Sequence, residues 1–320
     1  MKTLLHCFSS NDRFKAPPTF YRVLLIAILM AMATSSTFAQ VDVSVDIGYT
    51  QGRLRNGQPY SVQAVISNQG TAVNNRNVFL EVRGANTYND QLTLSLTATG
   101  QPGSDTTITF PAFSRPNTGI DTLRVFVPPD NNAANDTFTV IQEVTPGTES
   151  YIYPRQPLAL GGVGFNGNTG DFVARFSTSQ PDSLVQVLVD FFNAGIDYRI
   201  GIWDQDPVTG GPGNLIYESP QTLQTVAGQA IVPLDSAVAV SDTFFVGPRQ
   251  LVANNITFRF QDENPPRSGA YWFTAPTGGT VWNDFAPNSP FRFAIQVQYP
   301  ARAAPGCPGL LAPASNASNV

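Results

Sequence analysis

Residues 41–47 read VDVSVDI, a run in which every second residue is apolar. Successive side chains of a β-strand point to opposite faces of a sheet, so this alternation predicts a strand that buries its valines on one side. Similar segments recur as far as residue 144, separated by turn signals such as Asn56-Gly57. Seven strands are expected, at 41–49, 59–67, 76–83, 91–98, 105–110, 120–127 and 136–144.

Seven short strands in about 100 residues are typical of an immunoglobulin-like sandwich. The Cys pair and the Trp of antibody domains are missing from this block, so the expected fold is a relative without them. The segments VQAVISNQGTAVNNRNVFLEV (62–82) and PPDNNAANDTFTV (128–140) add a resemblance. They are similar to the second and third strands and the last loop of CARDB-type, adhesion-related domains. The resemblance implies a sandwich used as a spacer or adhesion module, with no catalytic residues.

A second block of strand-like segments follows residue 150. Residues 184–189, LVQVLV, are apolar almost throughout, as expected for a central strand. About ten strands are expected before residue 300, which exceeds an immunoglobulin domain and indicates a larger jelly-roll sandwich. No segment shows helical periodicity, so the predicted fold class is all-β: an immunoglobulin-like β-sandwich followed by a larger jelly-roll β-sandwich.

The second block also resembles a known module. The segments YRIGIWDQDPVTGGPGNLIYESPQTL (198–223), DTFFVGPRQL (242–251), YWFTAPTGGTVWNDF (271–285) and FRFAIQVQY (291–299) occur in this order. They are similar to a jelly-roll module of large secreted proteins from bacteria with type IX secretion. The resemblance implies an exported, multidomain protein and assigns no ligand.

The N-terminus indicates export. The run VLLIAILMAMA (23–33) has the length of a signal-peptide core, basic residues precede it, and Thr37-Phe38-Ala39 provides a cleavage site. We expect cleavage after Ala39, a secreted or cell-surface location, and no membrane insertion afterwards. The expected organisation is a signal peptide at 1–39, a CARDB-type sandwich at 40–145, a linker at 146–150, a jelly roll at 151–299 and a Pro/Ala/Ser-rich tail at 300–320. Further domains are expected to follow such a tail.

Loss of residues 1–39 would limit the available chemistry. The segment contains the only His, His6, and both lysines, and it would leave Cys307 as the single thiol. Nucleophilic triads and His/Cys zinc sites are then excluded. Cleavage would also remove four of the 18 basic residues but only one of the 23 acidic ones, and such an acidic chain is a poor nucleic-acid binder. We expect no enzyme activity, no cofactor and no nucleic-acid partner.

Asp204 and Asp206, in the segment IWDQDPVTGGPGNLIYE (202–218), are the most prominent carboxylates. On one strand their Cα atoms would lie about 7 Å apart, near the spacing of an inverting glycosidase, but catalytic carboxylates normally come from different strands. As oxygen donors in a Gly-rich loop, Asp204 and Asp206 are instead candidate ligands of a structural calcium ion. The alternative is that both only cap the turn, as Asp often does.

Aromatic residues suggest a second candidate site. Tyr271, Phe273 and Trp282 could form a platform on which a sugar ring stacks, because alternate residues of a strand share one face. Trp272 would then point into the core together with Trp203.

The expected function is a secreted or cell-surface, non-catalytic adhesion or scaffold protein that binds an extracellular protein or polysaccharide. Carbohydrate binding by the jelly roll, with a structural calcium ion, is the alternative. A third hypothesis is the non-catalytic N-terminal part of a larger secreted enzyme. The sequence leaves the oligomeric state open.

Overall fold

The computed structural model of the protein describes residues 40–300. The expected signal peptide at 1–39 and the tail beyond Pro300, with Cys307, lie outside the described residues. Within residues 40–300 the chain is all-β, which confirms the predicted fold class. No helix in this part of the chain is long and apolar enough to cross a membrane.

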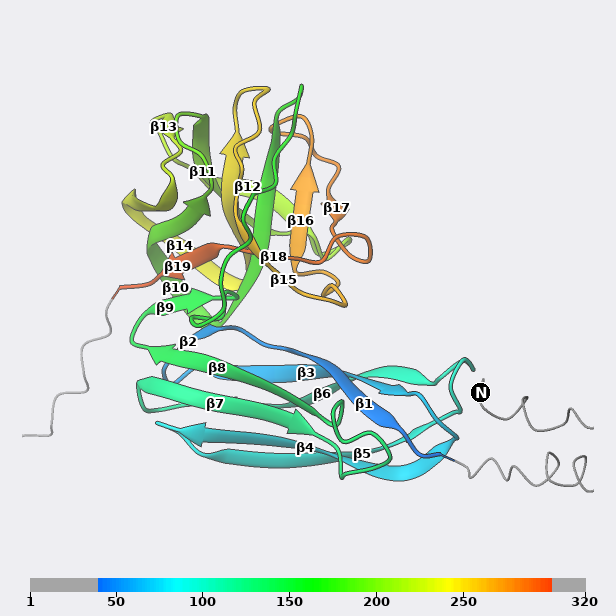
Figure 1. Ribbon diagram of the computed structural model, residues 1–320. Helices are drawn as coiled ribbons and strands as arrows, with labels where there is room; N and C mark the ends of the chain where they lie inside the picture. Colours follow the sequence, from blue (N-terminus) through cyan, green and yellow to red (C-terminus); the bar gives the residue numbers. More distant parts are fainter. Residues whose placement is uncertain (1–39, 301–320) are drawn as a thin grey trace, which may run out of the picture. The chain divides into compact units, whose positions relative to one another are not determined.

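Two sheets form the N-terminal sandwich. The strands β1, β3 and β6 make one sheet, and β8, β7, β4 and β5 lie side by side in that order in the other (Figure 1). Their apolar residues alternate into the space between the sheets, as Leu123 and Val125 of β7 do. The bounds are β1 Val43–Tyr49, β3 Pro59–Asn68, β4 Val73–Gly84, β5 Tyr88–Leu96, β6 Asp105–Ser114, β7 Gly119–Phe126 and β8 Thr137–Thr145.

Strand β1 departs from the regular alternation that its sequence predicts. The register with β3 shifts between Val45 and Ile47, so Asp46 forms a bulge. The hydroxyl of Ser44 donates to the Asp46 carboxylate at 2.6 Å, and Ser67 on β3 donates to it as well. As a result Val43 and Val45 enter the core between the sheets, whereas Ile47 is buried outside that cluster.

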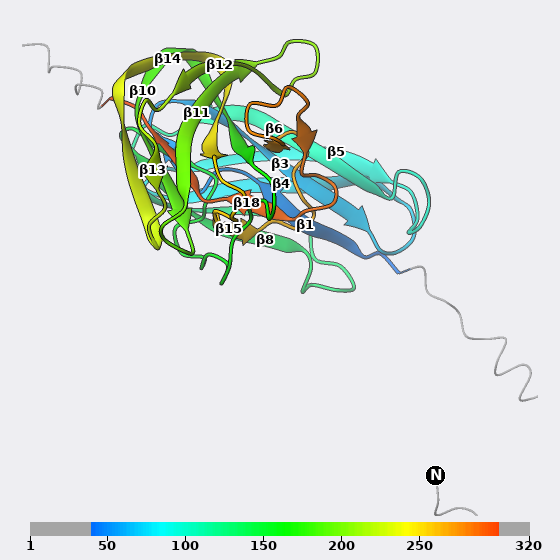
Figure 2. The same ribbon diagram turned by 90° about the horizontal axis from the view of Figure 1, so that it is seen from above.

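The C-terminal sandwich is built around two long strands, β10 (Gly170–Phe191) and β14 (Gly228–Gln250). They pair antiparallel from end to end, with register breaks near Thr178–Asp182 and Leu184–Gln186 where the pair can bend. Figure 2 shows β10, β11 and β14 neighbouring one another. The remaining bounds are β11 Asp197–Gln205, β12 Pro212–Glu218, β13 Leu223–Gln224, β15 Phe260–Asp262, β16 Tyr271–Thr274, β17 Asn283–Asp284, β18 Phe291–Phe293 and β19 Ile295–Gln298.

The two halves of β10 have different partners. Its first half pairs with β16 and its second half with β19, so the sheet divides and encloses a core rich in phenylalanine. The sequence predicts separate strands at 172–178 and 184–192, and at 228–233 and 242–247. They are instead single strands, because bulges interrupt the pairing register without ending the strands.

Two short strands connect the sandwiches. Strand β9 (Thr148–Ser150) pairs with β19 and with β2 (Arg53–Arg55), and β2 pairs in parallel with β8. One hydrogen-bonded sheet therefore runs from β19 to β8, and residues 41–300 belong to one compact unit. The segment 146–150 was expected to be a linker, but it contains β9. The sequence does not show this strand, because its buried positions are occupied by the polar residues Glu149 and Ser150 and not by apolar ones.

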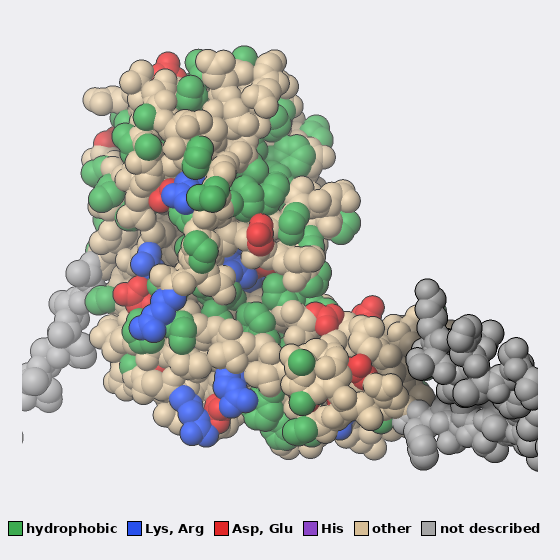
Figure 3. Space-filling model, in the orientation of Figure 1, with side chains coloured by type: hydrophobic (Ala, Val, Ile, Leu, Met, Phe, Trp, Pro, Cys, Tyr) green, Lys and Arg blue, Asp and Glu red, His purple; other side chains and the backbone are tan. Residues whose placement is uncertain are grey.

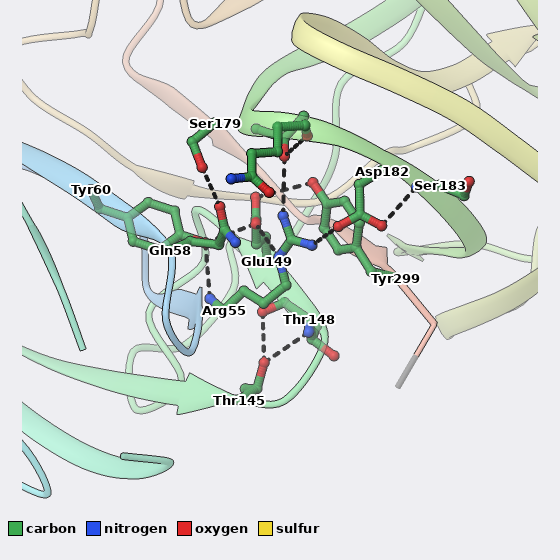
Figure 4. A network of polar contacts seen from close by, with 12 residues as sticks. Arg55, Gln58, Tyr60, Thr145, Thr148, Glu149, Ser179, Asp182, Ser183 and Tyr299 are labelled. Atoms are coloured by element: carbon green, nitrogen blue, oxygen red, sulfur yellow. Dashed lines mark hydrogen bonds and ion pairs between the residues drawn. The ribbon is translucent and has the colours of Figure 1, made fainter. Parts of the chain in front are cut away.

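A buried ion network lies where these strands meet (Figure 4). The Arg55 side chain, 1% exposed, donates from Nε to Glu149 at 3.1 Å and from Nη1 to Asp182. Its guanidinium stacks 3.6 Å from the centre of the Tyr299 ring. Glu149, 0% exposed, also accepts a hydrogen bond from Tyr60 at 2.7 Å. Burial raises the pKa of Glu149, although Arg55 and Tyr60 favour its charged form.

Candidate functional site

A cleft of about 500 Å³ opens between the β11–β12 hairpin and the loop that joins β16 to β17. Trp203, Gln205 and Asp206 line it from the end of β11, and Asn214 and Leu215 line it from β12. The loop contributes Gly278, Gly279, Thr280 and Trp282, and Arg249 lies at the end of β14. We call this hollow the hairpin cleft. Its size is that of a small-molecule site.

The hairpin is held in shape by the two predicted carboxylates. Asp204 accepts hydrogen bonds from the backbone and the side-chain amide of Asn214, at 2.5 and 3.1 Å. Asp206 accepts from the Val208 amide at 2.9 Å and the Thr209 hydroxyl at 2.8 Å. These bonds lower the pKa of Asp206, since they favour the charged form. Both carboxylates therefore act as turn caps, which the sequence analysis gave as the alternative to a calcium site.

The structure does not bring Asp204 and Asp206 together into a metal cage. Asp206 faces the hairpin cleft, whereas Asp204 lines a separate hollow with Ile216 and Val240. Among residues 40–300 no group of three or more His, Cys, Asp or Glu side chains is placed to hold a metal ion.

Calcium removal should accordingly leave the stability of the protein unchanged. We expect the melting temperature to be the same in millimolar calcium as in excess EDTA, because a bound ion would stabilise the folded state by mass action and the carboxylates already have hydrogen-bond donors. Thermal unfolding followed by circular dichroism tests this. A rise of several degrees with calcium that is lost in Asp206→Asn would contradict the turn-cap interpretation.

An aromatic cluster forms the floor of the cleft. Trp203 is 4% exposed and packs with Val173 and Phe245, as the sequence predicted for a core residue. The half-buried Trp282 meets it edge-on, with ring centres 5.4 Å apart. The guanidinium of Arg249 lies 5.7 Å from the centre of the Trp203 ring. Rigid rings of this kind offer apolar contact area at low entropic cost.

Arg249 is fixed by ion pairs. Its Nε donates to Asp171 at 3.0 Å and its Nη1 to Glu218 at 2.7 Å, and Glu218 also pairs with Arg199. Burial raises the pKa of Asp171, partly offset by the Gly278 amide and by Arg249. The Gly278 amide donates to Asp171 at 2.8 Å, which ties the loop to the sheet. The charges below the cleft thus pair with one another and fix its walls.

The structure places the three residues of the predicted aromatic platform in different surroundings. Trp282 lines the cleft, but Tyr271 is 1% exposed within the core, so the prediction that it stacks on a ligand is wrong. Phe273 is half-buried and packs against Phe165 and Phe285. The alternation of Tyr271 and Phe273 was correctly predicted, but they face the core. Trp272 lies on the opposite face of the strand and packs with Trp203 in a separate small core cluster, as predicted.

Four further residues line the cleft that the sequence does not predict there: Arg249, Asn214, Leu215 and Thr280. One signal was present, because Arg249 is a charged residue at the end of the apolar strand segment DTFFVGPRQL. A charged side chain in a buried strand needs a partner, and its partner Asp171 lies on the neighbouring strand β10.

The fold and the cleft define an all-β protein of two joined sandwiches with one ligand-sized aromatic hollow in the second. No family model matches the chain, and no curated protein matches it. Among solved structures it is similar to the CARDB domain of a Pyrococcus furiosus protein in complex with two metal ions, at 18% identity and a TM-score of 0.29 over 34% of this chain and 97% of that one.

A second similar structure contains the cysteine protease and lectin-like domains of a surface-layer-associated protein of Clostridium difficile. The identity is 12% and the TM-score 0.34, over 70% of this chain and 58% of that one.

Proposed function

We propose that the protein is a secreted or cell-surface, non-catalytic adhesion or scaffold module that binds its ligand in the hairpin cleft. The hairpin cleft is the observation that supports this proposal. Aromatic and polar side chains line it, while the ionised groups below it are paired with one another. Paired charges hold the shape of a site but are poorly suited to transfer protons.

The joined sandwiches support a scaffolding role. A ligand site on a rigid frame transmits force and position to the rest of the chain, whereas a flexible linker would let the two domains move independently. Here β9 and β2 replace a linker with paired strands. On the face drawn in Figure 3, charged side chains are few and of mixed sign, which favours recognition by shape and hydrogen bonding.

Carbohydrate binding is the second candidate, and Trp282 favours it. Its indole ring lies at the cleft beside amide and hydroxyl groups, namely Gln205, Asn214 and Thr280. A sugar presents an apolar ring face and several hydroxyls, so a ring flanked by neutral hydrogen-bonding groups matches both parts.

Substitution of the cleft tryptophan should weaken ligand binding. We expect the purified chain to be retained on an array of polysaccharides and extracellular proteins, and Trp282→Ala to weaken that binding about tenfold or more, as loss of a central aromatic contact does. The exposed Thr280→Arg, which fills the mouth of the cleft without touching the core, should have the same effect.

Phe192→Ala is the matched control, because this aromatic side chain is 45% exposed and does not line the cleft. It should bind like the unmodified chain. Retention on protein ligands alone would reject the carbohydrate candidate. Retention on no surface, or equal loss in all three variants, would reject the cleft as the recognition site.

A further inference from the structure

A second hollow, of about 230 Å³, lies where the two sandwiches meet. The N-terminal sandwich contributes Tyr49, Tyr60 and Ser61, and the C-terminal sandwich contributes Arg175 and Arg267. Neither sandwich alone supplies its walls. We call it the junction hollow, and it shares no residue with the hairpin cleft.

The lining of the junction hollow is basic. Two arginines line it and no carboxylate does, although the chain as a whole carries a net charge of −5. The exposed side chain of Arg175 makes no ion pair with any residue of the described range 40–300. An unpaired guanidinium in a concave site is a ready partner for an anion.

Arg267 is held rigidly at the same hollow. Its Nη2 donates to the Thr50 carbonyl at 3.0 Å and to Glu263 at 3.2 Å. Its guanidinium lies between two rings, 5.1 Å from the centre of Tyr49 and 4.9 Å from that of Tyr151. This arrangement fixes a cation using groups from both sandwiches.

The carboxylate beside Arg267 does not neutralise it fully. Glu263 also pairs with the buried Arg292 at 2.7 Å, so one negative charge serves two arginines. Together with Arg175, the groups around the hollow carry more positive than negative charge. The exposed hydroxyls of Ser61 and Ser177 at its wall can donate hydrogen bonds to a bound oxygen.

We infer that the junction hollow binds an oxyanion, such as a sulfate or carboxylate group, either as a free ion or carried on an acidic polysaccharide. Arg175 provides the adaptable charge, Arg267 the fixed one, and the serines neutral donors. The volume suits one such group with part of the unit that carries it. This binding is independent of the proposed ligand at the hairpin cleft.

Titration of the full chain with sodium sulfate, against sodium chloride of equal ionic strength, tests the inference. We expect sulfate alone to raise the melting temperature in a saturable way, since a ligand that binds only the folded state stabilises it. Arg175→Gln should weaken the apparent affinity about fivefold or more, as loss of a charge-assisted hydrogen bond does. Arg155→Gln, which removes an exposed arginine that does not line the hollow, should change nothing.

A second arm compares dextran sulfate with neutral dextran in the same variants. Binding of dextran sulfate that depends on Arg175 would indicate a polymer-borne group, and dependence seen only with inorganic sulfate would indicate a free ion. Both results support the site. Equal weakening by Arg155→Gln, or no effect of Arg175→Gln in either arm, would overturn it as diffuse surface attraction. Trp282→Ala should bind sulfate normally, which separates this test from that of the cleft.

Discussion

Replacement of Arg55 by Leu should lower the free energy of unfolding by about 3–5 kcal/mol, the cost of breaking a buried ion pair from one side. Arg55 and Glu149 are 1% and 0% exposed, so water cannot solvate the charged Glu149 carboxylate once Arg55 is removed. The change also removes the contact with Asp182 and the stacking on Tyr299, which lie in the C-terminal sandwich. Urea denaturation of the purified chain measures the effect.

Arg53→Leu is the matched control on the same strand. Arg53 pairs with Glu143 and donates to Gln296, but the Arg53 and Glu143 side chains are 28% and 37% exposed, and ion pairs that water reaches contribute at most about 1 kcal/mol. We expect its unfolding curve to lie close to that of the unmodified chain. Equal destabilisation by the two substitutions would show that the buried network contributes no more to the free energy of unfolding than the Arg53–Glu143 pair.

Gly52→Ala should make the two sandwiches unfold separately. A Cβ atom at this position would lie 2.0 Å from the carbonyl oxygen of Ile152, a backbone atom that cannot rotate away. The Gly52 amide donates to the Ser150 carbonyl at 2.9 Å, and the Gly52 carbonyl accepts from the Glu143 amide. Displacement of Gly52 therefore disturbs the pairing of β2 with β8 and β9. We expect a loss of about 1–3 kcal/mol, typical of overpacking, and a thermal transition that divides into two.

Gly161→Ala provides the control for this substitution. No heavy atom lies within 4 Å of the position that its Cβ would occupy. The extra methyl group should leave the melting curve unchanged. If Gly52→Ala shows a single transition at the original temperature, the backbone at Ile152 moves aside at little cost, which would contradict the prediction.

The fold could be predicted from the sequence because alternation reports directly on burial. Strands such as β7 follow it closely. The sequence could not show that β9 continues the sheet, since pairing depends on the distant strands β2 and β19 and leaves no local pattern. The bulge at Asp46 was equally hidden, because the serine hydroxyls that hold it come from two strands.

The candidate site was predictable only in part. Trp282 and the hairpin were found, since tryptophan and Gly-Pro turns are conspicuous in any sequence. The face of β16 was misassigned because both of its faces are covered, one by the phenylalanine core and the other by the hairpin residue Gly211, which approaches Trp272. Arg249 was missed because its partners lie on β10 and β12, far along the chain.

We infer that paired strands and a buried ion network make the two sandwiches one rigid frame that presents the hairpin cleft. Differential scanning calorimetry of the unmodified chain tests it most directly. We expect one transition in which the calorimetric and van't Hoff enthalpies agree, as for a single cooperative unit. Two resolved transitions, each with the enthalpy of one sandwich, would contradict it.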